Sequence, residues 1–402
     1  MKITDVRVIL CHGGMRTWTF VKVSTDEGIV GWGDASEWVR AQAHKTVVEE
    51  DLAPLVLGEN PFDIERLWQK MWVASYCGGK DLRVAMTGIE TALWDIVGKA
   101  LNTPVYNLLG GKCYDRIRLY YDNCDAYRAG YQGGTKWQPG DDSLEGIAKQ
   151  ARYIQELGFT ALKLHPMGLA NRPAVTRTAS LEAIEATVAK VAAVREAVGS
   201  KVDIAIDINN RLDLPSSEAL ARALEPYHLM FFEDPIRQDE SAGSYKRLVE
   251  ATSTPVGTGE NLYNVWDFRN YLEIGALDVV LPDVCHTGIL QAKKIAGLAE
   301  AYHLPLAPHN PNSPLSTIIS AHFCASIPNF LALEFMSDEY EPVWRDRITT
   351  PSVGSLVKNG HLELPTGPGW GVEMNEDEMA KHPYQEVWYS RQSSNWQDAE
   401  AK

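Results

Sequence analysis

Short, mostly apolar runs recur at even intervals through the central part of the chain, and each ends on a polar residue. Three of these runs finish at Asp207, Glu233 and Glu260, so their terminal carboxylates lie 26 and then 27 residues apart. A parallel strand, its turns and a return helix take roughly 30 residues. The spacing therefore predicts three consecutive strands of one parallel sheet, each ending on an acid.

The same pattern extends this sheet to eight predicted strands. Helical segments with apolar residues at three- and four-residue intervals separate the strands. Ser143 and Ser180 are suited to cap two of these helices, and Gly199 to end the second one. The predicted strands cover residues 116–122, 161–165, 203–209, 229–233, 255–260, 278–283, 304–309 and 331–334. Alternation of strands and helices predicts a (β/α) barrel, in which the carboxyl ends of the strands converge at the face that carries the active site.

The segments that flank the predicted barrel indicate a second domain. Residues 2–10 and 19–24 alternate like paired strands, and residues 41–111 have a helical pattern that ends at Gly110-Gly111. We predict an N-terminal domain over 1–113, a barrel domain over 114–352, and a C-terminal segment over 353–402 that returns to the first domain.

Composition narrows the class of protein. The 402 residues exceed one ordinary domain but fit a barrel of about 250 residues with a second domain. A net charge of −15 argues against nucleic acid or an anionic membrane as a partner, because both require clustered cations. No apolar run approaches the ~18 residues of a membrane span, and the N-terminus lacks a signal-peptide core. The six cysteines are scattered without a CxxC pair, so we expect reduced thiols in a cytoplasmic protein.

Polar side chains that can take part in acid/base or ion-pair chemistry also end the other predicted strands. Lys163 and His165 alternate on one strand, so both side chains should point into the barrel. Asp283 and His309 end adjacent strands, where a carboxylate can fix the tautomer of an imidazole and raise its basicity. Glu334 ends the last strand. Each residue alone is often structural, but their common position at the strand ends predicts one active site.

The three acids of the central strands predict a metal site. Carboxylates gathered at one face without a cation would repel one another and raise their pKa values. Hard oxygen ligands suit Mg²⁺, which keeps waters and substrate oxygens in its remaining positions. We expect Asp207, Glu233 and Glu260 to bind one Mg²⁺, with Asn209 and Asp234 beside it.

The ordered series of motifs resembles the enolase superfamily, mandelate racemase subgroup. The segment 92–111 is similar to that family's domain junction, and Pro365-Thr-Gly-Pro368-Gly-Trp-Gly371 is similar to its C-terminal crossing. The resemblance implies a modified TIM barrel, (β/α)₇β, under an α+β capping domain formed by the N-terminal part and the C-terminal segment. It also implies Mg²⁺-assisted removal of a proton α to a carboxylate, which gives an enediolate.

The chain departs from the family pattern at one position. His165 stands where the family's KxK motif has its second lysine, so this chain has KxH. Asp207-Ile-Asn209 is similar to the subgroup's DxN, and the catalytic histidine of DxH members is absent from this strand. We expect His309, oriented by Asp283, to be the principal acid/base. His165 is then a second proton-transfer group, because a neutral imidazole exchanges protons near pH 7.

These inferences favour an acid-sugar dehydratase acting on an aldonate or aldarate, which loses the C2 proton and then the C3 hydroxyl to give a 2-keto-3-deoxy acid. Lys163 would bind the substrate carboxylate, and a protonated Glu334 would donate to it. A racemase, epimerase or cycloisomerase using the same enediolate, and a non-catalytic metabolite-binding protein, are the alternatives.

A polar face suited to a polyhydroxylated substrate is the remaining expectation about the site. Substrate-binding candidates are Asn209, His12, Arg16, Lys80, Arg83, Asp122 and Asn123. Loops near 12–18, 77–83, 124–142 and 166–179 would help to enclose it. The expected partners are a small carboxylate sugar and, as is common in the family, further copies of the chain in a symmetric homo-oligomer.

Overall fold

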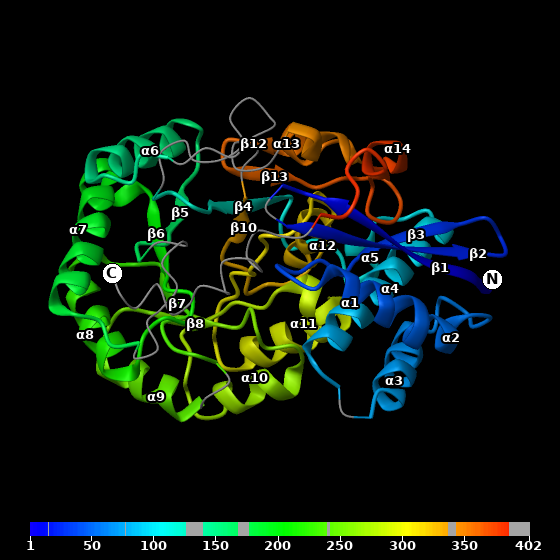
Figure 1. Cartoon of the computed structure of the whole chain (residues 1–402), viewed down its shortest axis with the longest axis horizontal. Helices are drawn as coiled ribbons and strands as arrows, with labels where there is room; N and C mark the ends of the chain where they lie inside the picture. The colour runs from blue at the N-terminus through cyan, green and yellow to red at the C-terminus, as the bar shows by residue number, and fades with distance from the viewer. Residues whose placement is uncertain are drawn as a thin grey trace.

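The computed structural model describes residues 1–14, 16–76, 78–125, 140–167, 177–238, 242–336 and 343–385. Two parts lie side by side in Figure 1, a sheet with helices that contains the N-terminus and a larger ring of strands and helices. None of the helices in these residues is both long and apolar enough to cross a membrane.

The N-terminal part is an antiparallel sheet covered by helices. Its strands are β1 (Ile3–His12), β2 (Thr17–Thr25) and β3 (Val30–Asp34), in the order β1-β2-β3. The helices are α1 (Ala41–Thr46), η1 (Val47–Leu52), α2 (Ala53–Val56), α3 (Ile64–Ala74) and α4 (Lys80–Ala100). Helix α4 packs directly on β3, because a Cβ at Gly33 would lie 1.9 Å from the carbonyl oxygen of Gly88. The alternating pattern of residues 2–10 and 19–24 thus correctly predicted a strand pair.

Parallel strands form the barrel. They are β4 (Arg116–Tyr121), β5 (Ala161–Leu164), β6 (Asp203–Asp207), β7 (Phe231–Glu233), β8 (Val256–Thr258), β9 (Val279–Val280) and β10 (Leu333–Phe335). Strand β10 pairs with β4 and closes the ring. The predicted strand 304–309 forms only isolated bridges, Leu306 with Val280 and Phe330 and His309 with Asp283. Pro305 and Pro308 lack N–H donors, so a continuous ladder cannot form there.

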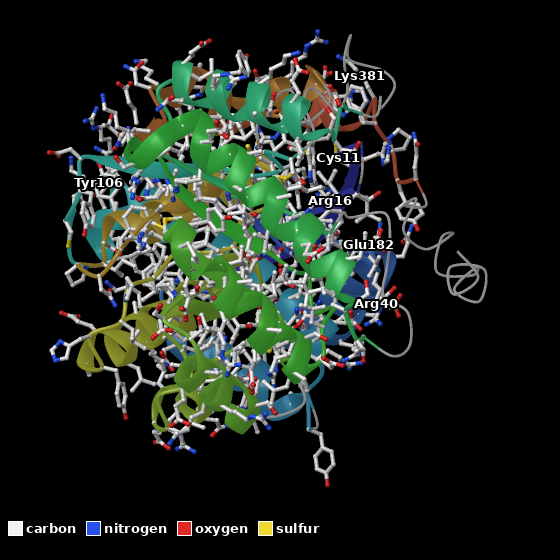
Figure 2. All side chains as sticks on the ribbon, turned by 90° about the vertical axis from the view of Figure 1, so that its left-hand side faces the viewer. Cys11, Arg16, Arg40, Tyr106, Glu182 and Lys381 are labelled. Carbon is white, nitrogen blue, oxygen red and sulfur yellow. The ribbon has the colours of Figure 1, made fainter. Side chains whose placement is uncertain are left out.

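Seven helices alternate with the strands and complete the (β/α)₇β order. They are α6 (Leu144–Glu156), α7 (Leu181–Val198), α8 (Leu214–Leu224), α9 (Ala242–Ala251), α10 (Val265–Leu272), α11 (Val284–Ala301) and α12 (Pro314–Ala325). Ser143 and Ser180 accept hydrogen bonds from Gly146 and Ala183 at their N-termini, as the sequence predicted. From the side, the green helix α7 stands on the outside of the barrel with Glu182 at its first turn (Figure 2).

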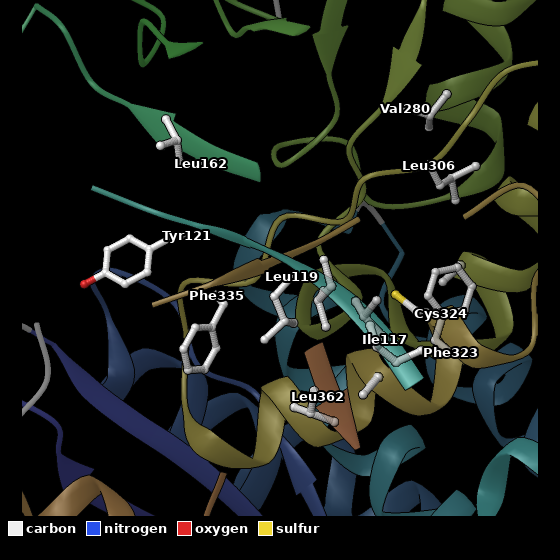
Figure 3. Close-up of a cluster of buried hydrophobic side chains, with 14 of the residues drawn as sticks. Ile117, Leu119, Tyr121, Leu162, Val280, Leu306, Phe323, Cys324, Phe335 and Leu362 are labelled. Atoms are coloured by element: carbon white, nitrogen blue, oxygen red, sulfur yellow. The ribbon is translucent and has the colours of Figure 1, made fainter. Parts of the chain in front are cut away.

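Alternation along the strands divides the apolar residues between two cores. The barrel interior is filled by Tyr120, Ala161, Ala205, Phe231, Val279, Leu281, Ala307 and Ala332. The opposite faces of the strands pack against the surrounding helices, where Leu119, Leu162, Phe323 and Phe335 belong to one buried cluster (Figure 3). Because Ala161 points inward, Lys163 of β5 and His165, directly after its end, point inward too.

The C-terminal segment joins both parts. It contains η4 (Val343–Arg347), β11 (Thr349–Thr350), α13 (Val353–Leu356), β12 (Val357–Lys358), β13 (His361–Glu363), β14 (Glu373–Met374) and α14 (Glu376–Met379). Strand β13 pairs with β4, whereas Trp370 donates to Asp95 at 2.9 Å and to the carbonyl of Trp32 at 2.8 Å. Figure 1 shows α14 beside the N-terminal sheet. The boundaries at 113 and 352 stay predictions, and residues 386–402 of the predicted segment lie outside the described part.

Short elements link these units. Helix α5 (Val105–Leu108) follows α4, and the 3-10 turns η2 (Gly199–Lys201) and η3 (Glu225–Tyr227) end the helices before β6 and β7. Gly199 ends α7 with a positive φ of 64° and ψ of −151°, a conformation that residues with a side chain rarely adopt. The cysteines at 11, 113, 124, 285 and 324 are free thiols, and Cys77 lies outside the described residues.

Candidate active site

The carboxyl ends of the barrel strands bring the predicted acid, base and ligand residues to one face. Asp207 and Glu233 are paired residues of neighbouring strands β6 and β7, and Glu233 in turn pairs with Gly257 of β8. Glu260 follows three residues later. Consecutive strand ends therefore place the three carboxylates next to one another, as their spacing in the sequence predicted.

Lys163 forms the centre of an ion-pair cluster inside the barrel mouth. Its Nζ lies 2.7 Å from Oε1 of Glu334, 2.9 Å from Oε2 of Glu233 and 3.7 Å from Oδ1 of Asp122. Burial would lower the pKa of Lys163, but these carboxylates outweigh burial and hold it well above its ordinary value. The side chain is thus a fixed, buried ammonium group.

His309 and Asp283 form the predicted dyad. Nδ1 of His309 lies 2.8 Å from Oδ2 of Asp283, and its Nε2 lies 3.0 Å from Oε2 of Glu260. Asp283 also caps helix α11 through the backbone N–H of Cys285 at 2.7 Å, which fixes the carboxylate. Burial would lower the pKa of His309, but Glu260 and Glu334 hold it well above the ordinary value. A carboxylate that can only accept fixes Nδ1 as the donor toward Asp283.

His165 belongs to a second dyad, which the sequence did not predict. Its Nε2 lies 2.8 Å from Oδ1 of Asp122 at the end of β4, and its Nδ1 lies 3.2 Å from Oδ1 of Asn209. Both neighbours of the ring are acceptors, so both ring nitrogens donate. Burial would lower the pKa of His165, but the Asp122 carboxylate outweighs burial and raises it to about 10.

The three carboxylates have the chemistry of a cation site. Oε1 of Glu233 is buried without a hydrogen-bond partner among the described residues. Burial raises the pKa of Glu233 to about 8, with Asp207 adding to the rise against the opposing effect of Lys163. A divalent cation would satisfy the free oxygen and relieve the repulsion, so the donor set fits Mg²⁺.

The side chains of the three predicted metal ligands are turned toward protein donors. Asp207 accepts from Asn209, Glu233 accepts from Lys163, and Glu260 accepts from Asn261 at 2.8 Å and contacts His309. Accordingly, no three His, Cys, Asp or Glu side chains of the described residues converge on one point as a preformed metal cage. Carboxylates adopt such pairings because neighbouring like charges repel. The sequence placed these residues correctly but could not give their side-chain directions.

Asp234 lies behind the ligand set. Its carboxylate accepts from Gln238, from Thr258 at 2.5 Å and from Asn210 at 3.2 Å. Burial raises the pKa of Asp234 well above its ordinary value, and the carboxylates of Glu260 and Asp207 raise it further. Asp234 therefore lies close to the three acids, and its role beside a bound cation stays a prediction.

The predicted substrate-binding residues have different surroundings. Arg16, from the loop after β1, is buried, donates to Asn312 at 3.3 Å and stacks 3.5 Å from the centre of the Trp38 ring. Asn312 in turn donates to Asp283 at 3.2 Å, so this loop reaches the dyad. Arg83 pairs instead with Asp267 at 2.9 Å, in a contact between the N-terminal part and helix α10.

His12 and Asp122 also have protein contacts, and their predicted role in substrate binding stays a prediction. His12 is partly buried at the end of β1, where its carbonyl accepts from Trp344 at 3.1 Å. Asp122 orients His165, so its oxygens have protein partners. Most of the predicted loops 124–142 and 166–179 lie outside the described residues, which omit 126–139 and 168–176.

Sequence reasoning missed polar residues that surround the dyad. His286 lies one turn after Asp283 at the start of α11, and Glu37 reaches the mouth from the segment after β3. Nζ of Lys80, a residue that the sequence did suggest, lies 2.9 Å from Oε1 of Glu37. The i,i+3 spacing from Asp283 was a signal for His286, whereas Glu37 carried none.

Comparisons with known proteins agree with this architecture. Residues 8–110 match the "Mandelate racemase / muconate lactonizing enzyme, N-terminal domain" family, and residues 146–378 match the "Enolase C-terminal domain-like" family. A D-galactonate dehydratase of Xanthomonas oryzae pv. oryzae is 40% identical over 386 residues, covering 95% of this chain and 94% of that protein. A D-xylonate dehydratase of Haloferax volcanii is 36% identical over 389 residues, covering 95% and 89%.

Solved structures give the same result. A mandelate racemase/muconate lactonizing enzyme-like protein from Rubrobacter xylanophilus superimposes with a TM-score of 0.84 and 36% identity, over 96% of this chain and 98% of that one. A mandelate racemase/muconate lactonizing enzyme from a Sulfitobacter species gives a TM-score of 0.86 and 30% identity, over 96% of each chain. With both family models, the ordered site and the (β/α)₇β barrel in agreement, the chain belongs to the enolase superfamily, in the mandelate racemase/muconate lactonizing enzyme family.

Proposed function

We propose that this protein is a Mg²⁺-dependent acid-sugar dehydratase, a hydro-lyase that converts an aldonate or aldarate to a 2-keto-3-deoxy acid. Relatives of 36% and 40% identity carry the names D-xylonate dehydratase and D-galactonate dehydratase. The observation that carries the proposal is the pair of carboxylate-oriented imidazoles, His309 with Asp283 and His165 with Asp122, at the two ends of the acidic series. Dehydration needs one group to remove a proton and one to protonate the departing hydroxyl.

The resident cation would be held by Asp207, Glu233 and Glu260. When bound there it would act as a Lewis acid on the substrate carboxylate, which supplies several kcal/mol of charge stabilisation. The unpartnered Oε1 of Glu233 and the mutual repulsion of the acids support this assignment. The remaining stabilisation comes from the chain itself.

Lys163 would bind the substrate carboxylate, and Glu334 would position Lys163. The ammonium group of Lys163 is buried and held among acids, so it offers a fixed positive charge to the negative charge that develops on the carboxylate. Glu334 would hold this ammonium group in place, because its Oε1 lies 2.7 Å from Nζ and its Oε2 accepts from the backbone N–H of Asn310. The contact of Lys163 with the substrate strengthens as charge develops, and only such contacts accelerate the chemical step.

Nε2 of His309 donates to Glu260 in this structure, and a cation held by Glu260 would weaken that contact. His309 would then remove the C2 proton through Nε2 while Asp283 holds Nδ1. The electron pair of the C–H bond moves toward the carboxylate and gives an enediolate. When the enediolate collapses, a C2–C3 double bond forms and the C3–O bond breaks. His165 protonates the leaving hydroxyl, which departs as water, and the resulting enol tautomerises to the 2-keto-3-deoxy acid.

An acid-sugar panel tests the proposal. Aldonates and aldarates of four to six carbons are incubated with Mg²⁺ and the purified protein, and 2-keto products are detected as semicarbazones. We expect turnover of at least one acid, loss of turnover in excess chelator and recovery on adding Mg²⁺. Absence of any 2-keto product across the panel would reject the dehydratase assignment.

A racemase or epimerase is the second candidate, and the same two dyads favour it. A two-base enzyme needs an acid/base group on each face of C2, and His165 and His309 are both oriented by carboxylates. Incubation in D₂O separates the candidates. Exchange of the C2 proton without a keto product would favour the racemase, whereas exchange with product favours the dehydratase. Binding of an acid sugar without either reaction would leave a metabolite-binding protein.

We also propose that the chain forms a symmetric homo-oligomer. Large apolar side chains exposed on the N-terminal part and on α10, namely Val73, Tyr76 and Trp266, support a self-association surface. Light scattering after size-exclusion chromatography measures the mass directly. A monomer mass at micromolar concentration would reject this part of the proposal.

A further inference from the structure

A histidine beside the dyad has an unused ring nitrogen. His286 lies in the first turn of α11 and is 4% exposed, and its Nδ1 is 2.9 Å from the backbone oxygen of Glu260. A carbonyl oxygen only accepts, so Nδ1 carries the hydrogen and Nε2 of the neutral ring is an acceptor. Nε2 is buried without a hydrogen-bond partner among the described residues. Oδ2 of Asp283, at 3.7 Å, is itself an acceptor and cannot serve as the donor.

An acceptor in this state indicates a donor that the described residues do not supply. Buried polar atoms are nearly always paired, because leaving one unpaired forfeits its interaction with water. The rigid hydrogen bond to the Glu260 carbonyl fixes the ring, so Nε2 cannot turn toward another protein group without breaking it. A ligand in the barrel mouth can supply the donor for Nε2.

Residues from both parts of the chain surround this nitrogen. The His286 ring lies 6.4 Å from the His309 ring and 6.0 Å from the Tyr263 ring, centre to centre. Nζ of Lys80 lies 3.2 Å from Oδ1 of Asn261, in the segment that carries Tyr263. Lys80 belongs to the N-terminal part and His286 to the barrel. The group is thus a subsite adjacent to the base, closed over by α4.

The charged groups of this subsite disfavour a second negative charge. Lys80 is paired with Glu37 at 2.9 Å, and Glu37 is 6% exposed, so one positive and one negative charge neutralise each other. Asp283 adds a further carboxylate next to His286. A second carboxylate on a substrate would be repelled by Glu37 and Asp283 and would face the lone pair on Nε2 of His286. A hydroxyl group can donate to Nε2 and accept from Lys80, at no electrostatic cost.

We propose that His286 is a substrate-binding residue whose Nε2 accepts a hydrogen bond from a hydroxyl beyond C3 of the acid sugar, and that this subsite selects aldonates over aldarates. The assignment rests on the proposed dehydratase function, which it deepens. It implies that the substrate carbons beyond C3 lie next to His309 and that one of them carries a hydroxyl group.

A pair of substitutions isolates the acceptor. In His286→Asn the side-chain amide can replace Nδ1 as donor to the Glu260 carbonyl but leaves nothing at the position of Nε2, whereas His286→Gln can place an amide oxygen there. For the best aldonate we expect kcat/KM to fall about 10-fold in H286N, as expected for one lost hydrogen bond, mostly through KM, with partial recovery in H286Q.

Deoxy analogues of the same aldonate provide the internal control. Wild type and H286N should show equal kcat/KM on the analogue that lacks the bonding hydroxyl, because the interaction is then missing in both. An equal loss in H286N on the parent acid and on every mono-deoxy analogue beyond C3 would overturn the proposal, since it would indicate a structural role. Thermal unfolding of both variants verifies that they are folded.

Replacement of Glu37 tests the preference for aldonates over aldarates. Glu37→Gln leaves Lys80 uncompensated, so the ratio of kcat/KM for an aldarate to that for the matching aldonate should rise severalfold. Glu65→Gln, which removes a like charge from an exposed pair with Lys294, is the matched control and should leave the ratio unchanged. An unchanged ratio in E37Q, or a wild-type preference for the aldarate, would overturn the selectivity claim.

The dehydratase assignment and the substrate-binding role of His286 can be rejected separately. If the wild-type protein turns over no acid sugar, the dehydratase assignment fails and the substrate role of His286 falls with it. If the wild-type protein turns over aldonates while H286N and H286Q are indistinguishable from it, the role of His286 fails alone.

Discussion

Replacement of Asp122 by Asn tests how the protein sets the acid for the departing hydroxyl. Asn preserves the shape of the side chain and removes its charge. In the wild type, Oδ1 of Asp122 lies 2.8 Å from Nε2 of His165, and this contact opposes the effect of burial and raises the pKa of His165 to about 10. His165 is then protonated at neutral pH, the state that a general acid needs.

The expected size of the effect follows from the loss of one buried carboxylate. Burial and the nearby Lys163 both act to lower the pKa of His165, so without Asp122 the pKa should fall well below about 10, and a tenfold change in proton affinity corresponds to about 1.4 kcal/mol. The second contact of the ring, to Oδ2 of Asp207 at 3.5 Å, limits the fall. Loss of an orienting partner costs roughly 10–100-fold, compared with about 10²–10⁴-fold for loss of the acid itself. D122N should therefore be less damaging than H165N.

The pH profile of kcat/KM is the decisive assay. A general acid works only below its pKa, so a lower pKa moves the alkaline limb of the profile to lower pH, and the loss in D122N should grow from pH 6 to pH 9. Asp203→Asn, the same change at the opposite end of the barrel, is the matched control, because Asp203 pairs with Arg118 on the surface. An unmoved alkaline limb would refute the acid role of His165. Higher activity at neutral pH would show that His165 is a base instead.

Three further predictions concern the metal, the base and the contact between the two parts of the chain. Single Ala substitutions of Asp207, Glu233 or Glu260 should abolish turnover and Mg²⁺ binding by calorimetry without unfolding the barrel, because the ligands lie at its mouth; full activity in excess chelator would contradict this. His309→Asn should lower kcat by about 10²–10⁴-fold in dehydration and in C2 deuterium exchange; wild-type turnover would exclude it as the base. Glu90 accepts from Ile289 and Leu290 at 2.9 and 3.0 Å, and burial raises its pKa to about 7, so its folded form holds a proton that the unfolded form releases near pH 4.5. Wild type should therefore lose about 3 kcal/mol of stability relative to Glu90→Gln as pH rises from 4.5 to 7, measured by urea unfolding, and a flat difference would refute the assignment.

The sequence located the strands and acids well because both depend on local patterns. Apolar runs of five or six residues with a fixed 26- to 27-residue interval specify strand and helix alternation, and a strand's period of two sends Lys163 and His165 inward. The prediction was poorer for residues 304–309, where Pro305 and Pro308 reduce a strand to single bridges. The apolar pattern was correct there, but proline removed the donors that a ladder requires.

The sequence alone determined which residues gather at the barrel mouth, since each reaches it from the end of its own strand. Only the tertiary structure decided the partners. Asp122 meets His165 because β4 and β5 are neighbours in the closed ring, and Asp122 was expected to bind substrate. Glu37 and Lys80 reach His286 because α4 and the segment after β3 cover the mouth, which no local pattern records. Hydrogen bonds depend on side-chain positions to within a few tenths of an ångström, and these positions follow from packing between segments that lie far apart in the chain.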